Sequence, residues 1–213
     1  MLNLFRDLIF TPTCIGCSAL GEHLCSRCRA GVEPKVYHAG SGPAAIHYAS
    51  PYGGWLRDAL VAYKNGSRRH VLGLAQVLHQ VLLHVQQEVS FMEELSLIVP
   101  MPSTPDKVAL RGFDTMELLV REALKLEPKI PARMAKALYV QRQVEDQVGL
   151  SASARRKNVD HSLAIRFPVP GTVLIVDDVV TTGSTMYEAN RVLRLGGASK
   201  VFGISLCGST KWG

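Results

Sequence analysis

The sequence predicts an α/β fold with a parallel sheet and flanking helices, preceded by a small cysteine-rich module. Two segments, residues 95–99 and 173–176, are short apolar runs with the length of buried parallel strands. Segments with helical periodicity lie between the predicted strands, and this alternation is typical of a parallel α/β sheet. In addition, four of the five cysteines fall within residues 14–28. We therefore divide the chain into a module at residues 1–33, a linker at 34–44 and a main domain at 45–213.

The first ten residues are apolar but interrupted by Arg6 and Asp7, and no cleavage site of small residues follows them. We therefore expect a short amphipathic helix here and not a signal peptide. No segment of the sequence approaches the length of a transmembrane helix. The sequence thus predicts a cytoplasmic protein.

Two C-x-x-C pairs follow, and their four thiols are the candidate metal ligands: Cys14, Cys17, Cys25 and Cys28. In a reducing compartment such pairs predict a tetrahedral thiolate site, most often for zinc. Disulfides are the alternative, which a reducing compartment disfavours. Four thiolates complete the coordination sphere without His23 and leave no open position, so we expect a structural zinc ion. The fifth cysteine, Cys207, is expected to be a small buried apolar residue.

The rest of the chain is predicted to alternate between strands and helices. Gly31 to Pro43 is rich in glycine and proline, which favours a linker. Strands are then expected at 45–49, 95–99, 135–140, 173–176 and 200–206, and helices at 56–63, 72–89, 113–126 and from 186 onward. In a sheet of this kind, ligands bind at the carboxyl ends of the strands.

The composition fits one domain of ordinary size with a small appendage, since 213 residues are present and 47% of them are hydrophobic. The formal net charge is +6. A mild basic excess is compatible with a nucleic-acid or polyphosphate ligand, and equally with a solvated basic surface.

The most informative segment runs from Thr172 to Met186. Its apolar strand is followed at once by two adjacent carboxylates, Asp177 and Asp178. A turn rich in hydroxyl groups then opens a helix: Thr181, Thr182, Gly183, Ser184 and Thr185. Unpaired N–H groups, hydroxyl groups and the positive end of the helix dipole meet at such a turn, which suits a phosphate. The carboxylates are acceptors suited to a diol or a bridging cation. The pattern therefore indicates a sugar monophosphate site, although Asp and Thr also serve as ordinary capping residues.

This segment resembles the PRPP-binding motif of type I phosphoribosyltransferases, D-D-x-x-T-T-G-x-T, with every motif position filled. Other segments resemble one branch of that superfamily, the ComF (GntX-like) competence proteins. They are the lysine loop 63–69, the V-P-x-P segment 99–102 followed by R-G-F at 111–113, and the predicted flap with Gln147–Leu150 and Ala154–Asn158. The chain departs from the family at Asp114 and Thr115, where Asn and Gln are usual.

The resemblance implies a phosphoribosyltransferase-type sheet and a set of roles for individual residues. Asp177 and Asp178 would be the catalytic carboxylates, holding the ribose hydroxyls directly or through Mg²⁺. Residues 181–185 would bind the 5′-phosphate of PRPP or a ribose 5-phosphate-type ligand, and Lys64 with Asn65 would meet the pyrophosphate. Possible anion or DNA contacts are Arg68, Arg69, Arg111, Arg155 and Arg156, whereas Phe113 is expected to pack rather than stack on a base.

The resemblance also implies a role in DNA uptake and natural transformation. The protein would bind PRPP and handle single-stranded DNA with a helicase partner, with or without phosphoribosyl transfer. The alternative is a metabolic phosphoribosyltransferase that joins PRPP to a base or amine. A PRPP-responsive transcription regulator is a third interpretation, but the sequence shows no helix-turn-helix. The sequence identifies neither the acceptor nor the oligomeric state.

Overall fold

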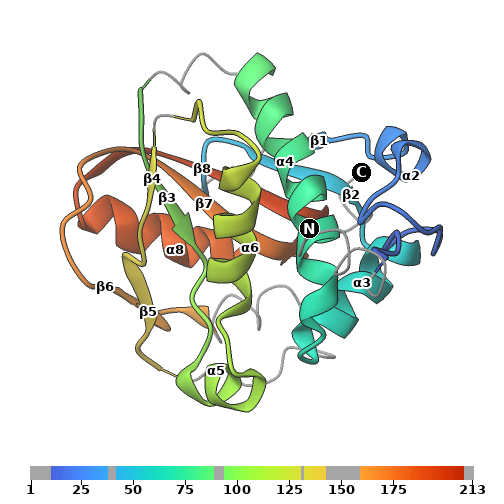
Figure 1. Cartoon of the computed structure of the whole chain (residues 1–213). Coiled ribbons are helices and arrows are strands. Elements are labelled where there is room, and N and C mark those ends of the chain that lie inside the picture. Colours follow the sequence, from blue (N-terminus) through green and yellow to red (C-terminus); the bar gives the residue numbers. More distant parts are fainter. Residues whose placement is uncertain (1–10, 38–41, 89–93, 131, 143–158, 209–213) are drawn as a thin grey trace.

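The computed structural model describes residues 11–37, 42–88, 94–130, 132–142 and 159–208 (Figure 1). Three predicted features lie outside the described residues. They are the N-terminal helix, most of the flap, and the two arginines Arg155 and Arg156.

Six strands form the main sheet, in the order β1-β2-β8-β7-β3-β4. Their bounds are β1 (Lys35–Tyr37), β2 (Ile46–Pro51), β3 (Leu95–Pro100), β4 (Arg133–Met134), β7 (Gly171–Val180) and β8 (Ala198–Gly208). Neighbouring strands pair in parallel, except that β1 runs antiparallel to β2. A second sheet pairs β5 (Leu138–Val140) with β6 (Leu163–Ile165) antiparallel. The expected α/β class with a mostly parallel sheet and flanking helices is confirmed.

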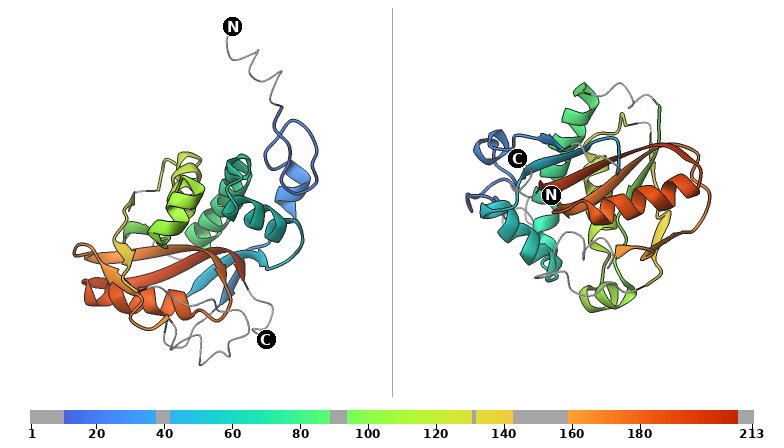
Figure 2. Two further views of the ribbon diagram at one scale, coloured as in Figure 1. Left: turned by 90° about the horizontal axis from the view of Figure 1, so that it is seen from below. Right: turned by 180° about the vertical axis from the view of Figure 1, so that it is seen from behind.

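Helices cover both faces of the main sheet. They are α2 (Ser26–Ala30), α3 (Gly54–Lys64), the 3₁₀ helix η1 (Arg68–His70), α4 (Val71–Glu88), α5 (Pro105–Arg111), α6 (Thr115–Lys125) and α8 (Ser184–Leu195). Figure 2 shows α3, α4 and α6 on one face and α8 on the other. Within the described ranges, none of these helices combines the length and the apolar composition that spanning a membrane requires.

Strand β7 lies between two hydrophobic cores because successive side chains of a strand point to opposite faces. Leu174 and Val176 pack in the core beneath α3, α4 and α6. Val173 and Ile175 pack in the core that includes the apolar face of α8. All four side chains are almost completely buried, which explains the continuous apolar run in the sequence.

The structure differs from the sequence prediction in the length of β7. The strand does not end at Val176 but continues to Val180, because β8 keeps pairing with it. Asp177 lies opposite Ser205 and Val179 lies opposite Cys207. The acidic pair therefore lies within the last part of the strand, where the ladder holds its backbone.

Helix α5 and strands β1, β4 and β6 are among the elements that were not expected from the sequence. Helix α5 follows the V-P-x-P segment, and strands β4 and β6 are only two and three residues long. Strand β1 falls within the predicted linker, where it extends the sheet as an antiparallel edge strand. Such short elements depend on their partner strands and leave little periodicity in the sequence.

The connections place a crevice at the carboxyl ends of β3 and β7, which are neighbours in the sheet. After β3 the chain leads through α5 to α6 on one face, whereas after β7 it leads to α8 on the other face (Figures 1 and 2). Ligands of open parallel sheets bind where the connections diverge in this way. The topology thus selects the end of the sheet that carries Asp177 and Asp178.

The cysteine module packs against α3 and α4. Cys14 and Leu24 are buried in the same core as these helices, with Ile15 packed against it. Gly73 of α4 lies against the module so closely that an added Cβ would be 2.6 Å from the His23 carbonyl oxygen and 2.8 Å from Ile15. A glycine at this position therefore permits the module to dock.

Candidate functional site

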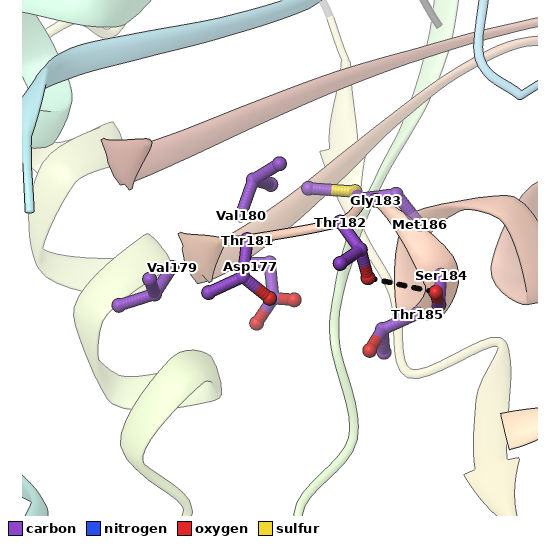
Figure 3. Close-up of a pocket in the computed structure, with 9 residues that line it drawn as sticks. All are labelled: Asp177, Val179, Val180, Thr181, Thr182, Gly183, Ser184, Thr185 and Met186. Atoms are coloured by element: carbon purple, nitrogen blue, oxygen red, sulfur yellow. Dashed lines mark hydrogen bonds between the residues drawn. The ribbon is translucent and has the colours of Figure 1, made fainter. Parts of the chain in front are cut away.

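The hydroxyl-rich turn connects β7 directly to α8. Gly183 has φ of +69°, a left-handed conformation that glycine adopts without strain, and it caps the helix that begins at Ser184. The Thr182 and Ser184 hydroxyl oxygens are 2.8 Å apart and hydrogen bonded (Figure 3). The first turn of α8 contains no acidic residue. The hydroxyl groups of Thr182, Ser184 and Thr185 gather at the positive end of the helix dipole, an arrangement suited to an anion.

The two carboxylates of β7 are in different environments. The Asp178 N–H donates to Asp177 Oδ1 at 2.8 Å. Asp178 Oδ2 lies 2.6 Å from Lys64 Nζ, which arrives from the end of α3. Asp178 therefore has a cationic partner, whereas the hydrogen bond to Asp177 comes from a neutral backbone group.

The ionisation of the pair reflects this difference. Burial, and then repulsion by Asp178, raise the pKa of Asp177 to about 7, although the Asp178 N–H and Lys64 act in the opposite direction. Burial opposes the charge of Lys64, but attraction to Asp178 outweighs it and raises the pKa of the ammonium group. Near neutral pH, Asp177 is thus partly protonated and partly ionised.

Asp177 is shared between two concave regions. On one side it lines a small hollow with the hydroxyl-rich turn. On the other side it lines a cavity of about 240 Å³, which we call the anion cavity, with Lys64, Ser103, Thr104, Lys107, Arg111 and Asp178 among its walls. The acids therefore lie between the small hollow at the turn and a larger cavity that carries three cationic side chains.

The cationic side chains of the anion cavity come from two helices. Lys64 lies at the end of α3 and is paired with Asp178, while Lys107 and Arg111 lie one helical turn apart on α5. Among the residues that the structure describes, neither Lys107 nor Arg111 has an ion pair or a hydrogen bond through its side chain. These two charges are available to a ligand that carries negative charge.

The other residues predicted as site residues are not all brought to this cavity. Asn65 is exposed and ends α3, where its N–H bonds to the Val61 carbonyl group. Arg68 and Arg69 lie in η1 and line a different cleft, beside the cysteine module. The guanidinium of Arg68 lies 4.6 Å from the centre of the Phe113 ring.

Phe113 of the R-G-F segment and Asp114, which follows it, have structural roles. Phe113 is buried against Tyr63, with ring centroids 5.5 Å apart, consistent with packing rather than base stacking. Asp114 caps α6 by accepting from the N–H groups of Met116 and Glu117 at 3.2 and 3.3 Å. The departure from the usual Asn is therefore compatible with a helix cap.

Sequence reasoning did not identify Lys107, Ser103 and Thr104 as parts of the cavity. They follow the V-P-x-P segment, and α5 turns Lys107 to the same cavity as Arg111. The available signal was the spacing of these cations, since residues four apart lie on one face of a helix. The spacing of Lys107 and Arg111 indicates a shared helical face only if residues 105–111 form a helix, and the sequence analysis expected no helix there.

The four cysteines of the module form one cluster, and their sulfur atoms lie within 4.8 Å of one another. A tetrahedral zinc site with Zn–S bonds of about 2.3 Å requires sulfur atoms about 3.8 Å apart; the Cys17 and Cys25 sulfurs are 3.6 Å apart. N–H groups of Gly16 and Cys25 donate to the Cys14 sulfur at 3.4 and 3.3 Å. The donor set and its spacing fit a zinc ion, and the cluster includes no histidine or carboxylate among the described residues.

Two thiols of the cluster have shifted pKa values in opposite directions. Burial disfavours the Cys14 thiolate, but backbone hydrogen bonds from Cys25, Cys17 and Gly16 outweigh it and lower the pKa to about 6. Burial, followed by hydrogen bonds with the neighbouring thiols, raises the pKa of Cys28 to about 12. Cys207 lies outside the cluster in β8 and is completely buried, and burial raises the pKa of its thiol to about 12.

The chain is similar to the DNA utilization protein YhgH of Escherichia coli strain K12, with 29% identity over 206 residues that span 94% of this chain and 85% of that protein. The YhgH protein of Escherichia coli O157:H7 gives the same identity and coverage. The chain is also similar to Competence protein F of Haemophilus influenzae, with 35% identity over 49% of this chain and 46% of that protein.

A scan against protein-family models found no match. Among solved structures, the chain resembles that of the allosteric regulatory enzyme of purine biosynthesis, with a TM-score of 0.37 and 19% identity, over 68% of this chain and 29% of that one. So loose a superposition assigns neither a site nor an activity. The sequence similarity, in contrast, extends over 94% of this chain with the DNA utilization proteins and over 49% of it with competence protein F.

Proposed function

We propose that this protein binds PRPP at the end of β7 and uses that site in DNA uptake. The observation that supports this most strongly is the position of Asp177, shared between the hydroxyl-lined hollow and the anion cavity. PRPP carries a 5′-phosphate, ribose hydroxyls and a pyrophosphate, in that order. The hollow, the acidic pair and the three cations of the anion cavity offer complementary groups in the same order.

Mg²⁺ is expected to enter with the ligand. Magnesium sites commonly use one or two carboxylates together with substrate phosphates, and the described acidic pair provides two carboxylates next to the anion cavity. The ion would neutralise part of the pyrophosphate charge. Asp177 and Asp178 would bind the ribose hydroxyls, and Lys64 would then exchange its contact with Asp178 for a contact with the pyrophosphate.

The role in DNA uptake follows from the relatives, which are named as DNA utilization and competence proteins. The net charge of +6 is compatible with contacts to nucleic-acid phosphates. We propose that PRPP binding and handling of single-stranded DNA occur in the same chain. A helicase partner stays a prediction from the family resemblance.

A second candidate function, phosphoribosyl transfer to a small acceptor, is favoured by one further observation. A cavity of about 430 Å³ shares Pro102 and Ser103 with the anion cavity and is walled by Leu138, Tyr139 and Arg166. The Arg166 guanidinium lies 5.0 Å from the centre of the Tyr139 ring. An acceptor bound there would approach the ribose, with pyrophosphate as the leaving group.

Calorimetric titration with PRPP and Mg²⁺ tests the proposed binding site. The double substitution Asp177→Ala with Asp178→Ala should abolish binding while leaving the zinc content unchanged. A matched control, Asp58→Ala with Glu94→Ala, removes two exposed carboxylates elsewhere and should leave affinity unchanged. Undiminished PRPP affinity in the Asp177 and Asp178 variant would remove the site assignment.

Complementation tests the proposed role. The chain should restore transformation to a Haemophilus influenzae strain that lacks its competence protein F, and the Asp177 and Asp178 double variant should not. Full restoration by that variant would separate the biological role from PRPP.

A further inference from the structure

The cleft between the cysteine module and η1 is a cavity that the proposed PRPP site does not use. Its volume is about 520 Å³. Arg68, Arg69 and His70 of η1, with Leu72 of α4, form its main-domain side. We call it the module cleft.

The charge of the module cleft is one-sided. Arg68 and Arg69 are exposed, and no acidic side chain is among the described residues that line the cleft. Within the described part of the chain, Arg69 makes no ion pair or hydrogen bond through its side chain. The cleft also lies at the start of α4, whose first turn carries no acidic residue. Helix dipole and arginines therefore act in the same direction and favour an anion.

The opposite wall adds neutral hydrogen-bonding and apolar groups. Thr13 and Ser18 of the module bring hydroxyl groups, while Pro12 and Ile15 bring apolar surface. Leu72 of α4 is 40% exposed. Arginines with hydroxyls and apolar side chains suit a strand that alternates phosphates with sugars and bases.

From these features we infer that the module cleft binds the sugar–phosphate backbone of single-stranded nucleic acid. The inference deepens the proposed function and rests on its DNA-handling part, but not on PRPP binding. Arg68 and Arg69 contact phosphates, and the apolar wall contacts sugars and bases without reading their sequence. A single strand can present its bases to this apolar wall, whereas the bases of a duplex are paired and stacked inside it. The module packs closely against Gly73 of α4, which forms the contact between the two walls.

The test is fluorescence anisotropy of a labelled oligothymidylate with the full zinc-loaded chain, at several salt concentrations. Each phosphate contact contributes about 0.7 to the slope of log affinity against log salt for single strands. Arg69→Gln should reduce this slope by about 0.7, and Arg68→Gln with Arg69→Gln by about 1.4. Affinity at low salt should fall roughly threefold or more for the single variant.

Arg133→Gln is the matched control. Arg133 is exposed on β4, the edge strand at the opposite end of the sheet from β1 and β2. The Arg133→Gln variant loses the same charge as Arg69→Gln. Its slope of log affinity against log salt should nevertheless equal that of the unchanged chain. An equal reduction of the slope in Arg133→Gln and Arg69→Gln would show diffuse electrostatic attraction and would overturn the assignment. An unchanged slope in Arg69→Gln would also overturn it.

Leu72→Lys gives a second test that does not depend on a weakened protein. A cation added to the cleft wall should tighten binding and steepen the slope by about 0.7.

Competition with inorganic phosphate separates a strand site from a site for an isolated phosphate. If inorganic phosphate displaces the oligonucleotide far better than chloride of equal ionic strength, the strand site is refuted. An equal affinity for duplex DNA would also refute it.

The experiments distinguish an incorrect assignment of the module cleft from an incorrect proposed function. PRPP titration of Arg69→Gln should match the unchanged chain, and so should its melting temperature and zinc content. If the unchanged chain binds no oligonucleotide, the DNA-handling part of the proposed function fails together with the cleft. If it binds and Arg69→Gln binds equally, the cleft alone fails.

Discussion

Asp177→Asn should stabilise the protein above pH 7 while removing an acid that the proposed site requires. Burial, followed by repulsion from the neighbouring Asp178, raises the pKa of Asp177 from 3.8 to about 7. In the unfolded chain the pKa returns to its ordinary value. Because the folded-state pKa is the higher one, ionisation of Asp177 favours the unfolded chain. The penalty grows from about pH 4 and is complete above about pH 7.

The magnitude follows from the same two pKa values. At about 1.4 kcal/mol per pH unit, the difference sets an upper bound of about 4 kcal/mol. Asp177 is only partly buried, so solvent screening reduces the effect, and we expect about 2 kcal/mol at pH 8. An amide retains the oxygen that accepts the Asp178 N–H. In a chain of this size the gain raises the melting temperature by roughly 4–8 °C.

Urea unfolding of both proteins at pH 5, 6, 7 and 8 measures the difference in free energy of unfolding. The advantage of Asp177→Asn should increase steadily with pH across this range. Asp178→Asn is the control in the adjacent position, and it should destabilise the protein because Lys64 loses its partner at 2.6 Å. A gain in Asp177→Asn that is equal at pH 5 and pH 8, or an absence of any gain at pH 8, would refute the account of the acidic pair.

Three other predictions concern the turn and the module. Gly183→Ala should lower stability by about 1 kcal/mol, because φ is +69°, and calorimetry should show weaker PRPP binding; unchanged values for both would mean that the turn relaxes freely. Gly73→Val should lower stability by about 2 kcal/mol in urea unfolding, because atoms of the module are 2.6–2.8 Å from the added Cβ. Gly53→Ala, with nothing within 4 Å, is its control, and similar losses in both would argue against tight docking. Zinc analysis should find one ion per chain, and a chelator should lower the melting temperature; an equal chelator effect in Cys14→Ser would show that the ion is bound elsewhere.

The sequence predicted those parts of the fold and site that depend on local pattern. The strand before Asp177 and the helix after Gly183 are adjacent in the chain, so their hydroxyls and carboxylates form a recognisable run. The four cysteines are equally local. Extended β7 was missed because its last residues, Asp177 to Val180, are held by pairing with β8 rather than by their own strand propensity.

The sequence did not predict contacts that require the tertiary fold. Lys64 and Asp178 are 114 positions apart, and only the packing of α3 beside the sheet brings them to 2.6 Å. Lys107 gains its meaning from α5, a helix of seven residues that leaves little periodicity. Arg68 and Arg69 were grouped with Lys64 because they share one loop, but η1 turns them to the module cleft.

If both proposals hold, this separation within a single loop would keep two kinds of phosphate apart. Lys64 faces the acidic pair, whereas Arg68 and Arg69, a few residues later, face the module cleft. The cation of Lys64 is already matched by Asp178, so in the free protein the anion cavity presents its charge mainly through Lys107 and Arg111. A ligand in the anion cavity has to compensate Lys64 and Asp178 for the loss of their ion pair. A nucleic-acid phosphate cannot do so, because it lacks the paired hydroxyls and the terminal pyrophosphate. Among the described residues Arg69 has no such partner to lose. On the proposed functions, the module cleft would therefore be the less costly position for a DNA strand, and the acidic site would be left to a phosphorylated sugar.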